Sequence, residues 1–118
     1  MIDTSPPSSS VLPIYPMREQ VMFPYMVFPL FIQAQEMPLI DEALRGEHLL
    51  GLVSCLSTGR PSRFEDLSRI GTVCRINQIF RFPEGGCKVV VEGVKRFRLI
   101  SATQRSPFLM ALVEVVVD

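Results

Sequence analysis

A run of apolar residues broken by prolines constrains the fold of this chain more than any other feature of its sequence. Residues 12–31 read LPIYPMREQVMFPYMVFPLF, with prolines at positions 13, 16, 24 and 29. Proline lacks a backbone N–H and fixes φ, so it is excluded from helix interiors and from central strands. We therefore predict short strands over Val11–Tyr15 and Met26–Ile32. The second strand contains Pro29, which places it at a sheet edge or at a bulge.

The middle of the chain predicts one helix followed by a buried strand. A helix is expected over Pro38–Arg45, because its proline suits the first turn, an apolar stripe follows, and Gly46 can end it. The continuous apolar run Leu49–Leu56 is typical of a buried strand. Residues 57–68 read as a loop, in which a capping-box pattern predicts a helical turn around Phe64–Leu67.

A β-hairpin is the clearest local signal in the second half of the chain. Apolar and polar residues alternate through Gly71–Phe82, the turn sequence PEGG follows, and Lys88–Val94 runs back. Gly93 predicts a bulge, the strand continues over Phe97–Ala102, and Phe108–Val117 is the last strand. About six strands and one helix, with short links between antiparallel neighbours, favour a small β-barrel or sandwich.

Length and composition indicate one folded domain. The chain has 118 residues, of which 47% are hydrophobic, and this excludes an intrinsically disordered chain. No apolar run reaches about 18 residues, the length that would span a membrane. The Ser- and Pro-rich residues 1–10 predict a flexible leader before a domain over residues 11–118. Because the chain ends on the apolar sequence VEVVVD, we expect it to be cut from a longer protein.

The cysteines and the histidine lack the spacing of a metal or catalytic site. Cys55, Cys74 and Cys87 form no CxxC pair, which indicates reduced, packed thiols in a cytoplasmic protein. Zinc would need more than the one histidine, and we place His48 in a loop after the helix. A Cys–His nucleophile pair would have to use Cys55, which lies in an apolar run. We expect no metal, no cofactor and no catalytic residue.

Charge is unevenly distributed along the chain. The net charge is zero, yet residues 69–105 hold eight basic residues against two acidic ones, a balance of +6. A basic half suits an acidic partner such as RNA. No aromatic RNA-binding motif accompanies it, so nucleic acid is not the favoured partner. The alternative is that the basic side chains lie on solvated strand faces.

Three blocks of sequence resemble one family. The blocks are LPIYPMREQVMFPYMVFPLF at 12–31, FEDLSRIGTVCRI at 64–76 and FPEGGCKVVVEGVKRFRL at 82–99. In order, spacing and residue type they are similar to the N-terminal, substrate-binding domain of the Lon ATP-dependent protease family. The resemblance implies a mainly β (α+β) fold, a six-stranded PUA-like pseudo-barrel with one short α-helix. It also implies recognition of unfolded or damaged proteins and support of a hexamer whose ATPase and Ser–Lys protease centres lie in other domains.

Six residues are candidates for contact with protein substrates. The stretch after position 21 is rich in methionine and aromatic residues, and methionine recurs at promiscuous binding surfaces. An exposed patch of this kind suits unfolded segments. The alternative is that these residues fill the barrel core, as we expect for Phe23 and Phe28. The candidates are Met22, Tyr25, Met26, Gln33, Gln35 and Glu36, of which the last three stand where the family often carries charged residues.

The sequence therefore favours a non-catalytic protein-recognition module of a Lon-type protease. No phosphate-binding loop is present, so the chain carries no ATPase motif of that kind. Two alternatives remain open, a freestanding Lon-domain adaptor protein and a PUA-like RNA-binding module. The last strand, at Leu112–Val117, is a further candidate contact if it forms a sheet edge. Ordinary pairing inside the barrel is the alternative for that strand.

Overall fold

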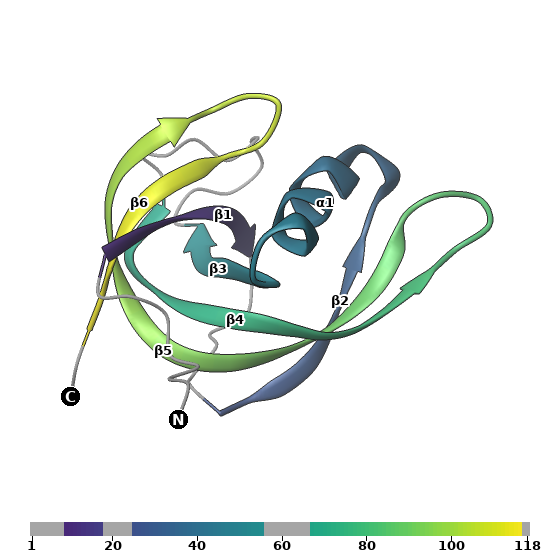
Figure 1. Ribbon diagram of the computed structural model, residues 1–118, viewed down its shortest axis with the longest axis horizontal. Helices are drawn as coiled ribbons and strands as arrows, with labels where there is room; N and C mark the ends of the chain where they lie inside the picture. The colour runs from purple at the N-terminus through teal and green to yellow at the C-terminus, as the bar shows by residue number, and fades with distance from the viewer. Residues whose placement is uncertain (1–8, 18–24, 56–66, 117–118) are drawn as a thin grey trace.

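Two long strands, β4 (Leu67–Arg81) and β5 (Cys87–Gln104), form the frame of the fold. A computed structural model describes residues 9–17, 25–55 and 67–116 of the chain. The hairpin between β4 and β5 extends from one side of the molecule with β2 beside it, and β1, β3 and β6 gather on the other side, as Figure 1 shows. The remaining elements are β1 (Ser9–Met17), β2 (Val27–Ile32), the 3₁₀ helix η1 (Ala34–Glu36), α1 (Met37–Arg45), β3 (Leu49–Cys55) and β6 (Met110–Val115).

The sheet closes on itself at one end. Its strand order is β2-β5-β4-β3-β1-β6, and β6 pairs with β5 as well as with β1. Five strands thus form a closed barrel, while β2 pairs only with the first part of β5, from Ile32 opposite Cys87 to Val27 opposite Glu92. Closure pairs the barrel parts of these strands on both sides and leaves two edges in the described part of the chain, β2 and the hairpin part of β4 at residues 78–81, each of which pairs only with β5.

Bulges bend the long strands so that they can serve both the barrel and the hairpin. Val94 of β5 has no partner residue in the register with β4, and Ile100 and Thr103 of β5 have none in the register with β6. Asn77 of β4 likewise has no partner residue in the register with β5. An extra residue in one strand bends that strand and increases its twist. The bulge at Val94 adjoins Gly93, where the sequence predicts one.

Two hydrophobic cores lie on opposite faces of the sheet. One fills the barrel around Phe97, whose side chain is fully buried. Gly51 and Gly71 border this ring: a Cβ at either position would lie 2.9 or 2.6 Å from Phe97 atoms. The other core lies between α1 and β2, β3, β4 and β5, and α1 contributes Leu39, Ile40 and Ala43 to it.

Most predicted elements are present, with shifted bounds. β1 begins at Ser9, so Ser9 and Ser10 pair with β6 instead of belonging to the leader. α1 begins at Met37, has Pro38 in its first turn, and ends at the C-cap Gly46. The predicted strands over 88–94 and 97–102 are one continuous strand, β5. His48 follows α1 in a turn with a positive φ of 65°, in agreement with the expected loop position.

Two expectations from the sequence are wrong. Leu67 and Ser68 belong to β4 and not to a loop or helical turn; residues 64–66 of that expected turn lie outside the described residues. β1 runs parallel to β3, although antiparallel neighbours were expected. Of the two readings of the last strand, ordinary pairing is confirmed, because β6 pairs with β1 on one side and with β5 on the other. Long-range pairing of this kind leaves no local sequence signal.

Candidate functional site

Exposed apolar side chains gather on one face of the sheet beyond the barrel. Neighbouring strands place Phe31 of β2 beside Lys88 of β5, and Lys88 beside Phe80 of β4. The next row holds Pro29 beside Val90. Val27, Phe31 and Phe80 expose 56%, 66% and 46% of their surface. We call this surface the outer face, and its residues are Val27, Pro29, Phe31, Phe80 and Val90.

The outer face is exposed because the opposite face of the same strands is already packed. In β2 the alternate residues Phe28, Leu30 and Ile32 turn toward the core under α1. Successive side chains of a strand point to opposite faces, so the intervening residues must face solvent. A sheet segment with apolar residues on both faces, one of them uncovered, is typical of a surface that binds a partner.

Polar groups border the outer face. The Lys88 ammonium lies 4.9 Å from the centroid of the Phe80 ring, a cation–π contact that covers part of that ring. At the other end the Asn77 amide donates a hydrogen bond to the Glu92 carboxylate over 3.3 Å. On the outer face Lys88 thus lies between Phe31 and Phe80, and Glu92 lies between Val27 and Arg75.

A bulge decides that Phe80 belongs to the outer face. Cys74 and Ile76 are buried on the α1 side, and strict alternation would place Gln78 and Phe80 there as well. The bulge at Asn77 shifts the alternation by one residue, so Ile79 packs toward the α1 core and Phe80 faces solvent. Sequence reasoning missed Val27, Pro29, Phe31 and Phe80; the period-2 pattern of residues 27–32 could have indicated the first three.

Two of the predicted binding residues lie where β2 begins. Tyr25 has a positive φ of 72° and exposes 84% of its surface, and Met26 exposes 39%. Backbone hydrogen bonds of 2.9 Å join both residues to Gly93 of β5. Both side chains are thus exposed at the start of β2, one and two residues before Val27 of the outer face. Met22 lies outside the described residues.

The other three predicted binding residues form the cap of η1, at the far end of β2. The Gln33 backbone N–H donates to the Glu36 carboxylate over 2.9 Å, and the Gln35 amide contacts the Gln33 side chain. Glu36 also accepts a hydrogen bond from Tyr15; burial, the Glu36 charge and this bond raise the pKa of Tyr15 to about 12. β2 separates the cap from Tyr25 by roughly 20 Å of extended chain. The structure therefore brings the predicted residues into two groups and not into one.

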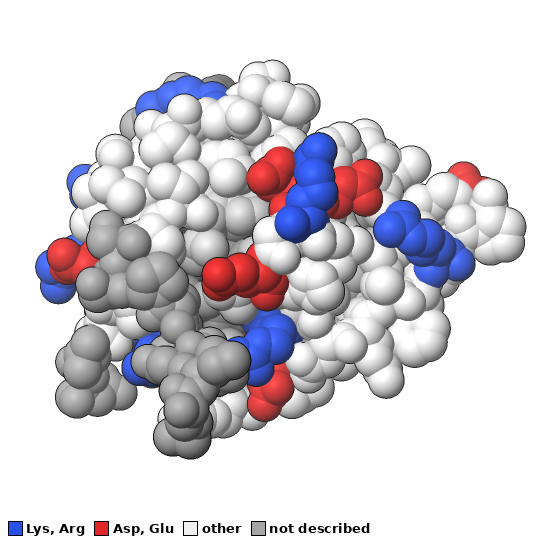
Figure 2. Space-filling view, in the orientation of Figure 1, with Lys and Arg blue, Asp and Glu red and all other residues white. Residues whose placement is uncertain are grey.

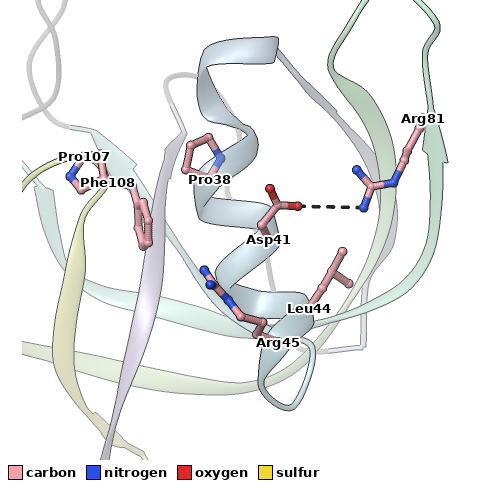
Figure 3. Close-up of a pocket in the computed structure, with 7 residues that line it drawn as sticks. All are labelled: Pro38, Asp41, Leu44, Arg45, Arg81, Pro107 and Phe108. Carbon is pink, nitrogen blue, oxygen red and sulfur yellow. Dashed lines mark ion pairs between the residues drawn. The ribbon is translucent and has the colours of Figure 1, made fainter.

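An open cleft of 610 Å³ lies over the exposed side of α1 (Figure 3). Asp41 on the helix and Arg81 at the end of β4 form an ion pair of 3.9 Å across it. On the other side of the cleft, Pro107 and Phe108 come from the loop between β5 and β6. Its full lining is Pro38, Asp41, Leu44, Arg45, Arg81, Pro107 and Phe108. Both partners of this ion pair are exposed to solvent, so the pair contributes little to the stability of the fold.

The basic second half of the chain does not form one cationic surface on the face shown in Figure 2, where positive and negative side chains are interspersed. Arg81 pairs with Asp41 of α1, and Arg98 pairs with Glu114 of β6 over 3.6 Å. Acidic residues distant in sequence thus come close to basic ones in the fold. This arrangement favours the reading of solvated strand faces over a nucleic-acid surface.

No catalytic or metal-binding group emerges among the described residues. They contain no cluster of three or more His, Cys, Asp or Glu side chains that could hold a metal ion. Cys74 and Cys87 are free and fully buried, and burial raises the pKa of both thiols, for Cys74 to about 12. A raised pKa keeps a thiol protonated and unreactive. Within the same ranges, no helix has the length and apolar character needed to cross a membrane.

The family model of the ATP-dependent protease La (LON) substrate-binding domain matches residues 11–118. The chain belongs to this family. It is 40% identical over 106 residues to a Lon protease of Citrifermentans bemidjiense, covering 90% of this chain and 13% of that protein. It is 36% identical over 107 residues to a Lon protease of Dictyoglomus thermophilum, covering 90% and 14%. The chain thus spans a small part of the length of these relatives.

Solved structures of Lon N-terminal domains share the fold. A Lon N-terminal domain protein from Xanthomonas campestris superposes with a TM-score of 0.67 at 22% identity, over 91% of this chain and 59% of that one. The N-terminal domain of the Mycobacterium avium complex Lon protease gives 0.65 at 24% identity, over 91% and 54%. These comparisons confirm the family and the mainly β fold with one short helix expected from the sequence. By its family the chain is a Lon substrate-binding domain.

Proposed function

We propose that this Lon domain binds unfolded or damaged protein segments through the outer face and presents them to a Lon-type ATP-dependent protease. The observation that carries the proposal is the exposure of the apolar residues Val27, Pro29, Phe31 and Phe80, with the half-buried Val90 beside them. Unfolded segments expose apolar side chains without a fixed shape, and an open apolar surface can contact many of them. Tyr25 and Met26 are exposed at the end of β2 where Val27 lies, and we include both in the proposed binding surface.

The remaining candidates take lesser roles in the proposal. Gln33, Gln35 and Glu36 would contact a segment that runs past the end of β2, and Met22 one that runs past its start. The full-length protein would be a cytoplasmic hexamer in which this domain supports assembly. The buried, protonated thiols of Cys74 and Cys87 are consistent with that compartment.

Binding of a permanently unfolded protein tests the proposed function. We expect dye-labelled lysozyme, reduced and alkylated, to bind the 118-residue chain in a fluorescence anisotropy titration, whereas native lysozyme does not. The double variant Phe31→Ala, Phe80→Ala removes two exposed rings and should weaken binding about tenfold, or about 1.4 kcal/mol. The matched control is Ile100→Ala, which removes an apolar side chain of similar exposure from a bulge distant from the outer face. Equal loss in the double variant and the control would contradict the proposal.

A further inference from the structure

Among the described residues, β5 is the one strand that pairs with β2, and we call the other side of β2 its free edge. This edge offers backbone hydrogen-bonding groups next to the outer face. The Gly93 N–H donates to the Met26 carbonyl over 2.9 Å, so this residue pair is of the hydrogen-bonded kind. Such pairs alternate with non-hydrogen-bonded ones along an antiparallel ladder. The backbone groups of Val27, Pro29 and Phe31 therefore point away from β5 and toward the free edge.

The same three residues turn their side chains to the outer face. A strand added along β2 would thus hydrogen-bond to the backbones of Val27, Pro29 and Phe31. Every second side chain of the added strand would lie on the outer face, next to the side chains of these three residues. Main-chain bonds of this type give affinity that does not depend on sequence, and the side chains add preference. A binder of unfolded segments needs this combination.

We propose that β2 accepts an extended, proline-free segment of an unfolded polypeptide as an additional strand, with apolar side chains at alternate positions on the outer face. This inference rests on the proposed function and specifies how the substrate backbone is held. The donors at the edge are the N–H groups of Val27 and Phe31; the acceptors are the carbonyls of these two residues and of Pro29.

Pro29 disfavours a second copy of this chain as the source of the added strand. Because the backbone of Pro29 faces the free edge, its missing N–H removes no bond of the ladder with β5. Pairing of two β2 strands would lack two donors, one from each Pro29, whereas a proline-free segment would lack only one. Proline on an edge strand is a known means of preventing edge-to-edge association.

Two matched comparisons test strand addition. The first uses a short soluble peptide with valine at alternate positions, and a twin of the same sequence in which every central amide is N-methylated. Methylation removes the N–H groups and blocks approach to a strand edge, while the side chains stay. We expect the parent peptide to shift the amide resonances of Val27 and Phe31 in an NMR titration, and the twin to bind at least tenfold more weakly.

The second comparison uses Val27→Pro and Val27→Ala, with the alkylated lysozyme of the preceding section as ligand. Both variants lose the valine side chain, but only Val27→Pro loses the N–H at the free edge, so it should bind several-fold more weakly than Val27→Ala. If Val27→Pro fails to fold, the peptide pair decides. Equal binding of both peptides, or of neither, would overturn strand addition. If strand addition fails but alkylated lysozyme still binds, the proposed function stands. If alkylated lysozyme does not bind either, strand addition and the proposed function are both overturned.

Discussion

At the scale of single residues, the contact between Tyr15 and Glu36 joins β1 to the cap of η1. Tyr15 is half-buried against the core under α1, and Glu36 holds the Gln33 backbone at the same time. The phenol is neutral in this site, because burial and the neighbouring carboxylate both oppose its ionisation. A predicted substrate contact, Glu36, thus also has a structural role that its place in the sequence does not reveal.

This contact makes stability depend on alkaline pH. The pKa of Tyr15 rises from 10.0 to about 12 in the folded chain. Between these values the unfolded chain loses the phenol proton and the folded chain keeps it, so the free energy of unfolding falls as pH rises. We expect Tyr15→Phe to remove this part of the pH dependence. Urea midpoints of both proteins at pH 9 and pH 11.5 check it, and parallel losses in the two would contradict it.

At the scale of elements, α1 stabilises the part of the sheet that carries the outer face. Its buried stripe of Leu39, Ile40 and Ala43 shares one core with residues of β2, β4 and β5, and the helix also lies against β1 and β3. The helix thereby holds Phe28, Leu30 and Ile32 inward and fixes which residues of β2 remain outside. The sequence predicted this helix and its stripe, because the capping and spacing signals are local.

Loss of packing under α1 should be costly. Ile40 is fully buried, so Ile40→Ala should lower the free energy of unfolding by about 3 kcal/mol. Leu44 is only partly buried and lines the open cleft, so Leu44→Ala should cost less than about 1.5 kcal/mol. Urea denaturation of both variants gives the comparison. Similar costs at the two positions would show that α1 does not pack as described.

At the scale of the whole molecule, the two cores share one continuous sheet. Cys74 of β4 and Cys87 of β5 both belong to the core under α1, while Val73, next to Cys74, belongs to the barrel core. Exposure of either thiol therefore requires the core under α1 to open.

Thiol reactivity should report the opening of the core under α1. In the native chain at pH 8 we expect Cys74 and Cys87 to react with iodoacetamide at least a hundredfold more slowly than in the denatured chain, because both are buried and protonated. Mass spectrometry of the digested chain assigns the label to each cysteine, including Cys55. Labelling of both should rise together with urea. Rapid labelling of native Cys74 would contradict the described core.

The sequence by itself determined the family, the number of strands, the helix and the hairpin turn, because each of these depends on neighbours in the chain. Pro29 marked an edge strand, and the turn glycines Gly85 and Gly86 have the positive φ values that such a turn requires. The tertiary structure alone decided which residues share a surface. Closure of β6 onto β5 left β2 as an edge, and the bulge at Asn77 turned Phe80 outward beside Phe31. Proline acts on the backbone of its own strand, so the proline-rich segment alone indicated an edge strand. Strand partners and bulges depend on residues far apart in the chain, so only the fold decided which side chains lie beside that strand.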